Sequence, residues 1–184
     1  MTFSQTEAIL ENAEVNGVSP KDIAKVFRLR DGWEYVLNNL DNEVNLGMLE
    51  ELHQIVARED VPWERLGVLR DEAVRISGTN YLPELPDAEK VYREIREILS
   101  GDGSDTDMAV SLVLYVMRAQ LFLDGNKRVA TLICNKILIE RGRGIFSLPP
   151  EAKEEFGKLL VKFYESGEAD EIKKFIFKKC LSGY

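Results

Sequence analysis

The chain has 184 residues, 45% of them hydrophobic, which is enough to form one buried core without disulfides. Its formal net charge of −8 excludes broad nucleic-acid binding, which depends on clustered lysine and arginine. The two cysteines, Cys134 and Cys180, lack metal-ligand spacing, and we expect reduced thiols in a cytoplasmic protein. The polar N-terminus and a longest apolar run near 109–117 predict no signal peptide and no membrane span.

The first third of the chain has helical periodicity. Asn16-Gly17 is a stop signal for a first helix, and Ser19-Pro20 is a start signal for the next. Apolar residues at 49, 52 and 56, together with His53, lie on one face of a later helix. These patterns predict helices at about 5–15, 20–27, 31–39 and 45–58.

The segment "VRISGTNYLPELP" (74–86) has a different pattern. Val74 and Ile76 alternate with polar residues, four turn-forming residues follow, and Tyr81 resumes an extended pattern before two prolines. Alternation on both sides of a turn is typical of a short β-hairpin.

The second half of the chain contains its most hydrophobic segments. The run "MAVSLVLYVMRAQLF" (108–122) is apolar nearly all round and predicts a buried central helix. A second core helix starts near Val129 and is closed by Arg141-Gly142. Further helices are expected at 87–99, 151–166 and 168–180. The sequence therefore predicts one mainly helical domain with a small β-hairpin.

The segment "FLDGNKR" (122–128) joins these two core helices. A helix N-terminus offers unpaired backbone N–H groups and the positive end of the helix dipole, which together attract anions. Gly125 lets the backbone turn toward a ligand, Lys127 and Arg128 add positive charge, and Asp124 is an oxygen ligand that Mg²⁺ accepts beside phosphates. A plain capped turn is the alternative interpretation.

The same segment resembles the Fic/Doc signature, His-x-Phe-x-Asp/Glu-Gly-Asn-Gly/Lys-Arg-x-x-Arg. Phe122 and the run 124–128 match it position by position. The resemblance extends to "ELHQIV" (51–56), to "LGVLRDEAVRISGTNYLPELP" (66–86) with its Gly-x-x-Arg, and to "NKILIERGRGIFSLPPE" (135–151). About 130 residues follow the family pattern in order.

This resemblance implies a mainly helical Fic fold with a β-hairpin flap in residues 45–184, preceded by an N-terminal helical extension, residues 1–44. It implies binding of ATP with Mg²⁺ and transfer of AMP to a hydroxyl of a target protein; Doc-type relatives transfer a phosphate instead. By position, Asp124 would hold the metal. Gly125, Asn126, Lys127 and Arg128 would bind the nucleotide, with Arg128 also stabilising the transition state.

The flap would pair its edge with an extended segment of the target, as in strand addition. Ile76, Gly78, Thr79 and Tyr81 are its expected contact residues. The partners implied are thus a nucleotide and a target protein, with neither nucleic acid nor membrane, and the sequence leaves an oligomer open.

Two positions depart from the signature. Gln120 stands where the family has its catalytic base, His, and a neutral amide orients a hydroxyl but does not take its proton. Gln120 is therefore either a positioning residue in an altered site or an ordinary helix end. His53, the only histidine, is expected to be a core residue rather than a substitute base. Thr131 replaces the final Arg.

The N-terminal helix is either an ordinary amphipathic helix or a relic of the family's inhibitory helix. In the second interpretation Asn12 takes the place of its Ser/Thr and Asn16 that of its Glu. Three functions remain open at this point: weak or altered AMP transfer, nucleotide binding without catalysis, and Doc-like phosphate transfer.

Overall fold

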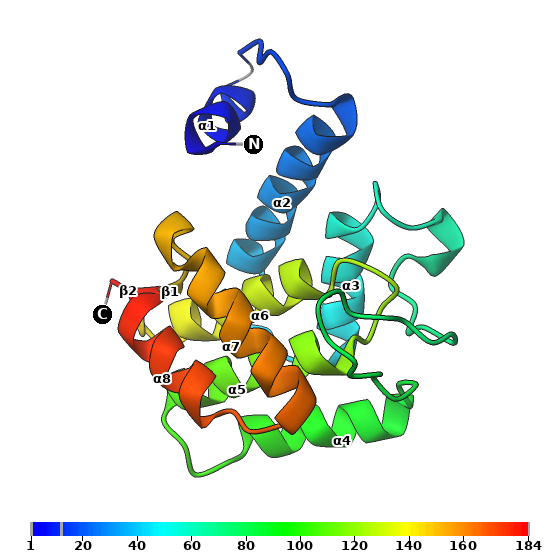
Figure 1. Ribbon diagram of the computed structural model, residues 1–184, viewed down its shortest axis with the longest axis vertical. Coiled ribbons are helices and arrows are strands. Elements are labelled where there is room, and N and C mark those ends of the chain that lie inside the picture. Colours follow the sequence, from blue (N-terminus) through cyan, green and yellow to red (C-terminus); the bar gives the residue numbers. More distant parts are fainter. Residues whose placement is uncertain (1, 12, 184) are drawn as a thin grey trace.

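The computed structural model describes residues 2–11 and 13–183, and helices dominate it (Figure 1). Its elements, in chain order, are α1 (Phe3–Leu10), α2 (Pro20–Asn38), α3 (Leu46–Val56), η1 (Trp63–Arg65), α4 (Ala88–Leu99), α5 (Asp105–Ala119), α6 (Asn126–Glu140), β1 (Ile145–Phe146), η2 (Pro150–Ala152), α7 (Lys153–Ser166), α8 (Asp170–Lys179) and β2 (Leu181–Ser182). Among these elements, no helix is long and apolar enough to cross a membrane.

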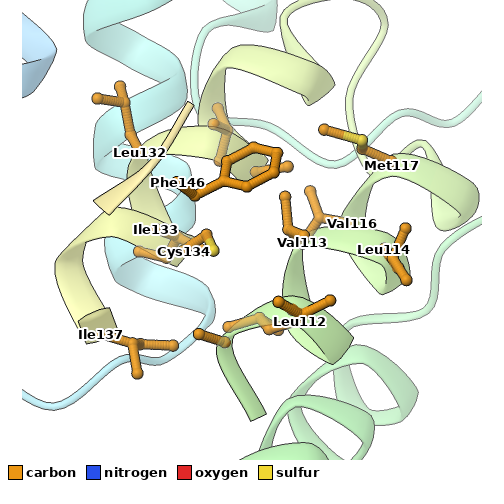
Figure 2. Packing of buried hydrophobic residues seen from close by; sticks show 14 of the residues in the cluster. Leu112, Val113, Leu114, Val116, Met117, Leu132, Ile133, Cys134, Ile137 and Phe146 are labelled. Carbon is orange, nitrogen blue, oxygen red and sulfur yellow. The ribbon is translucent and has the colours of Figure 1, made fainter. Parts of the chain in front are cut away.

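The core is built around α5 and α6, the two segments that the sequence marked as most hydrophobic. Side chains of α5 and α6 pack toward each other, with Phe146 of β1 among them (Figure 2). Val113, Val116, Leu132 and Ile133 are fully buried. A buried side chain of this size contributes about 1.5–3 kcal/mol, so this pair of helices fixes both ends of the segment that joins them.

The predicted helices at 20–27 and 31–39 are in fact one helix, α2, so the break expected between residues 27 and 31 is wrong. Gly32 is buried inside the helix. A Cβ added there would lie 2.7 Å from Leu132 Cδ1 and 2.9 Å from Val56 Cγ1. The glycine is present because α2 approaches α3 and α6 closely, and not because the helix ends.

The β-hairpin expected at 74–86 is not formed, and the only sheet of the described residues lies elsewhere. That small antiparallel sheet pairs Ile145 with Ser182 and Phe146 with Leu181. Residues 74–80 make no backbone–backbone hydrogen bond with any described residue. The guanidinium of Arg70 instead binds the carbonyls of Glu72 and Glu84, so a side chain closes this loop where a strand ladder was predicted.

The N-terminal helix is shorter than expected, since α1 ends at Leu10 with Glu11 as its C-cap. Asn12 lies outside the described residues, and Asn16 lies in the turn that precedes α2. Cys134 and Cys180 are both free and buried, and burial raises the pKa of the Cys180 thiol to about 11.

The close approach at Gly32 gives a test of the packing. We expect Gly32→Ala to lower the free energy of unfolding by about 1–3 kcal/mol, because the added methyl group overpacks the contact with Leu132 and Val56. Gly157→Ala in α7 is the matched control, since nothing lies within 4 Å of its added Cβ. The control should gain about 0.5–1 kcal/mol of helix stability. Urea unfolding measures both, and equal effects would contradict the packing assignment.

Candidate functional site

The turn between α5 and α6 begins at Gln120, the C-cap of α5. Its backbone is left-handed, with φ +48° and ψ +61°, and among the described residues it is the only one other than glycine with a positive φ. Its side-chain amide is held at both ends: Nε2 donates to the Met117 carbonyl at 2.6 Å, and Oε1 accepts from Asn126 Nδ2 at 3.2 Å. The amide of Gln120 is thus engaged within the protein.

Arg70 binds the backbone carbonyls of this turn. Its guanidinium, 2% exposed as a residue, donates to the carbonyls of Ala119 and Gln120 at 3.4 and 2.5 Å. The backbone N–H of Arg70 donates to the Leu121 carbonyl at 3.0 Å. A cation at the C-terminal end of a helix is favoured by the helix dipole, so Arg70 stabilises the end of α5 as well as the turn.

The side chain of Asn126 binds the backbone of the loop that precedes it. It is 3% exposed, and its side chain accepts from the Phe122 N–H at 2.9 Å while donating to the Phe122 carbonyl at 2.7 Å. The side chain of Asn126 therefore shapes the loop rather than facing solvent.

The N-terminus of α6 has free backbone donors. Gly125, its N-cap, has φ +78° and provides no side chain, and no other side chain caps the helix. The backbone N–H groups of Asn126 and Lys127 have no acceptor among the described residues. Lys127 is exposed beside them. Two free amides, a helix dipole and a lysine together can bind an anion.

Arg128 is engaged in the protein in a way that the sequence did not indicate. Its guanidinium donates to the Val56 carbonyl and to Asp60 Oδ2, the latter at 2.5 Å. Asp60, whose side chain is 4% exposed, also contacts Lys25 of α2 at 2.7 Å. Burial alone would raise the pKa of Asp60, but hydrogen bonds from Lys25 and Arg128 outweigh it, so the pKa is lowered overall. Asp60 is thus a buried carboxylate bound by Lys25 and Arg128, with Lys21 of α2 at 3.8 Å as a third cation.

His53 is fully buried and both of its ring nitrogens are used. Nδ1 accepts from the Gly67 N–H at 2.9 Å, which leaves Nε2 to donate to the Asp124 carbonyl at 3.1 Å. The ring stacks on Phe122 with centroids 4.1 Å apart. Burial lowers the pKa of His53 to about 4. The expectation of a core histidine is confirmed, and its role is to position the loop.

Asp124 is the exposed carboxylate of the loop, with its side chain 62% accessible. Its Oδ1 accepts from the Gly125 N–H at 2.5 Å and lies 3.6 Å from Arg128 Nη2. The described part of the chain contains no cluster of three or more His, Cys, Asp or Glu that could coordinate a metal. A single carboxylate fits Mg²⁺ that arrives with phosphates, since this ion keeps most of its ligands as water and phosphate oxygens.

The predicted flap residues lie against α7 rather than against the loop at 122–128. Thr79 Oγ1 donates to Glu165 at 3.0 Å, and a Cβ on Gly78 would lie 3.8 Å from Val161. Tyr81 stacks on Tyr164 with ring centroids 6.5 Å apart, and Ile76 packs against the core.

Two residues of the site were missed from the sequence. Arg70 belongs to the Gly-x-x-Arg segment quoted above, so its position carried a signal even though no contact was inferred from it. Asp60 carried none, because "REDVP" after α3 resembles any acidic surface loop. Its partners come from α2 and α6, which only the fold brings together.

The helical architecture, the 122–128 loop and its amides agree with one family. A sequence model described as "Fic/DOC family" matches residues 43–138, and the chain belongs to that family. A search of curated proteins found no match.

Solved structures share the fold. Fic-1 (residues 134–508) from C. elegans superposes with a TM-score of 0.77 and 21% identity, over 97% of this chain and 55% of that one. This chain thus spans about half the length of that solved chain. A Fic domain containing signaling protein from Bacteroides thetaiotaomicron gives a TM-score of 0.77 at 18% identity, over 97% and 75%. BepC from Bartonella tribocorum, solved with bound AMPPNP, gives 0.59 at 14%, over 91% and 95%. The prediction of a mainly helical Fic fold is confirmed, although the small two-stranded sheet is formed by β1 and β2 and not by the hairpin expected at 74–86.

The buried histidine predicts an acid-sensitive fold. Because the folded-state pKa of His53 lies near 4, the unfolded chain binds a proton that the folded chain does not as pH falls below about 6.5. Stability contributed by neutral His53 is complete above that pH and is lost on acidification. We expect the difference in free energy of unfolding between wild type and His53→Gln to shrink by about 2–3 kcal/mol from pH 7.5 to 4.5. A pH-independent difference in urea unfolding would contradict this.

Proposed function

We propose that residues 122–128 bind the phosphates of ATP together with Mg²⁺, and that the chain transfers AMP slowly to a hydroxyl of a target protein. The observation that carries this proposal is the start of α6, where the backbone N–H groups of Asn126 and Lys127 have no acceptor in the described part of the chain and lie beside an exposed lysine. Membership of the Fic/DOC family and the AMPPNP bound by BepC support it.

Asp124 would hold Mg²⁺, which would screen the phosphate charge and polarise the phosphoryl oxygens. The amides of α6 and Lys127 would bind phosphate oxygens. Arg128 would join them only after giving up at least part of its contact with Asp60, so phosphate and Asp60 compete for one guanidinium.

We expect a slow rate because position 120 offers no acceptor for the proton of the target hydroxyl. In AMP transfer, a bond forms between the hydroxyl oxygen of the target and the α-phosphorus. The bond from that phosphorus to the β-phosphate oxygen breaks, and pyrophosphate leaves. The hydroxyl proton needs an acceptor, and the amide of Gln120 is not one; its Nε2 and Oε1 are moreover bound to Met117 and Asn126. His53 is equally unavailable because both of its nitrogens bind backbone groups.

A second candidate function is nucleotide binding without catalysis. It is favoured by the same observation, that the side-chain amide of Gln120 is bound within the protein. In either case the flap would bind the partner chain. The backbone groups of 74–80 are free of backbone hydrogen bonds to described residues, so an extended target segment could pair with them.

Calorimetric titration with ATP and Mg²⁺ tests the site. We expect Arg128→Ala to weaken ATP binding about 10- to 100-fold, the loss of a charged hydrogen bond to phosphate. Asp60→Asn should act in the opposite direction, tightening binding roughly two- to fivefold, because it removes the competing carboxylate. Arg141→Ala, at the far end of α6, is the control and should bind ATP as wild type does. Unchanged affinity in Arg128→Ala would refute the site.

Transfer from labelled ATP to lysate proteins tests the chemistry. We expect label from the α position, and a rise of about 10²–10⁴-fold in Gln120→His, because a base is restored at the start of the loop. Label only from the γ position would identify phosphate transfer instead. A Gln120→His variant that binds ATP yet transfers nothing would show that the protein is a binding module.

A further inference from the structure

A cavity of about 600 Å³ lies outside the 122–128 loop, none of whose residues line it. It is lined by residues of α4, of α5, of the segment 81–87 and of the end of α7 and the start of α8, and it is open to solvent on one side. These elements lie at the lower half of the molecule in the view of Figure 1. Pockets for small molecules commonly measure about 300–1,000 Å³, so the cavity is large enough for one.

Arg118 of α5 is fixed at the wall of this cavity. Its guanidinium carbon lies 4.3 Å from the ring centroid of Tyr81 and 5.8 Å from that of Phe163. Its Nε donates to the Tyr164 carbonyl at 3.2 Å. Gly167 lies close by, and a Cβ there would come within 3.4 Å of Nη2. Packing on aromatic rings holds the guanidinium in one orientation without using its two Nη groups.

The two Nη groups of Arg118 have no acceptor among the described residues, and no carboxylate of this part of the chain lies within 4.0 Å of them. The other cations of the wall are paired. Lys90 binds Glu84 at 2.8 Å, and Lys173 binds Asp107 at 2.8 Å. Arg118 is therefore the positive group of this cavity that is left for a ligand.

The other residues of the wall determine which kind of anion the cavity can bind. Apolar side chains make up much of it: Leu82, Leu85, Val91, Leu114, Leu121 and Phe163. Asp87 and Glu94 also line it, so a doubly charged phosphate would meet like charges and only one unpaired cation. A carboxylate carries one charge and matches the planar fork of a guanidinium with two parallel hydrogen bonds.

We propose that this cavity binds a small carboxylic acid with an aromatic or branched apolar body, held through its carboxylate by Arg118. The apolar body would lie against Leu114 and Phe163. Ala119 and Leu121 line the same cavity and flank Gln120, so an occupant would contact the chain on both sides of that residue. The proposal does not depend on nucleotide binding.

Amide NMR titration of the whole chain with 3-phenylpropionate tests this, with 3-phenylpropanol as the uncharged analogue. We expect saturable shifts of the amides at 81–87 and 114–121. Arg118→Gln should weaken binding of the acid about tenfold or more and leave binding of the alcohol unchanged, because only the acid pairs with the guanidinium. Lys173→Gln, a wall cation already paired with Asp107, should bind the acid as wild type does.

Ser111→Phe provides a second test that leaves Arg118 intact, since Ser111 lines the cavity from α5 and a phenyl group there would fill it. This variant should bind neither compound. Three results would overturn the proposal: shifts outside the cavity only, equal affinity for acid and alcohol in wild type, or unchanged binding of the acid in Arg118→Gln.

Discussion

The loop, the end of α5 and the base of the flap all depend on one buried guanidinium. Arg70 binds five backbone carbonyls, at residues 72, 83, 84, 119 and 120, and no carboxylate among the described residues. Burial lowers the pKa of Arg70, but an arginine remains charged in a protein. The hydrogen bonds to these carbonyls offset the free energy that burying the charge costs. Each carbonyl left without a donor would cost about 1–3 kcal/mol, which makes the five contacts mutually dependent.

The hydrogen bonds of Arg70 connect the flap with the 122–128 loop, two segments for which different functions are proposed. Glu72 and Glu84 are at the two ends of the flap, and Gln120 is the first residue of the turn into the 122–128 loop. One side chain therefore sets the position of the segment proposed to meet a partner relative to the segment proposed to meet a nucleotide. Because Arg70 fixes both ends of the flap, no ladder of hydrogen bonds between strands is needed to hold them. The flap is therefore an open loop between two fixed ends.

One cation of the loop, Arg128, is already paired within the protein before any ligand arrives. Asp60 is bound by Lys25 from α2 and by Arg128 from α6, so α2 takes part in the electrostatics of the loop. The amides of Asn126 and Lys127 form the part of the loop that is not committed to the protein itself. Amides fixed at a helix start need no rearrangement to meet an anion, whereas Arg128 does.

The sequence predicted those parts of the protein in which local pattern and tertiary packing agree. The apolar periodicity around Val113 and Leu132 identified both core helices, and the motif residues located the loop. It failed where contacts distant in sequence decide the outcome. The helix α2 was predicted as two helices, and the contacts of Gly32 with Leu132 and Val56, which come from other elements, leave no local pattern in the sequence. The alternation around Ile76 resembled a strand, yet Arg70 supplies the bonds that a ladder would have supplied. Asp60 had no pattern at all.

The left-handed backbone at position 120 limits how this chain can change over time. Residues other than glycine seldom adopt that conformation, and asparagine, aspartate and histidine adopt it most readily, while β-branched residues are excluded. Mutational drift at this position is therefore confined to a short set of side chains, and histidine belongs to that set. The backbone at this position would therefore accept an imidazole in place of the Gln120 amide without changing its conformation.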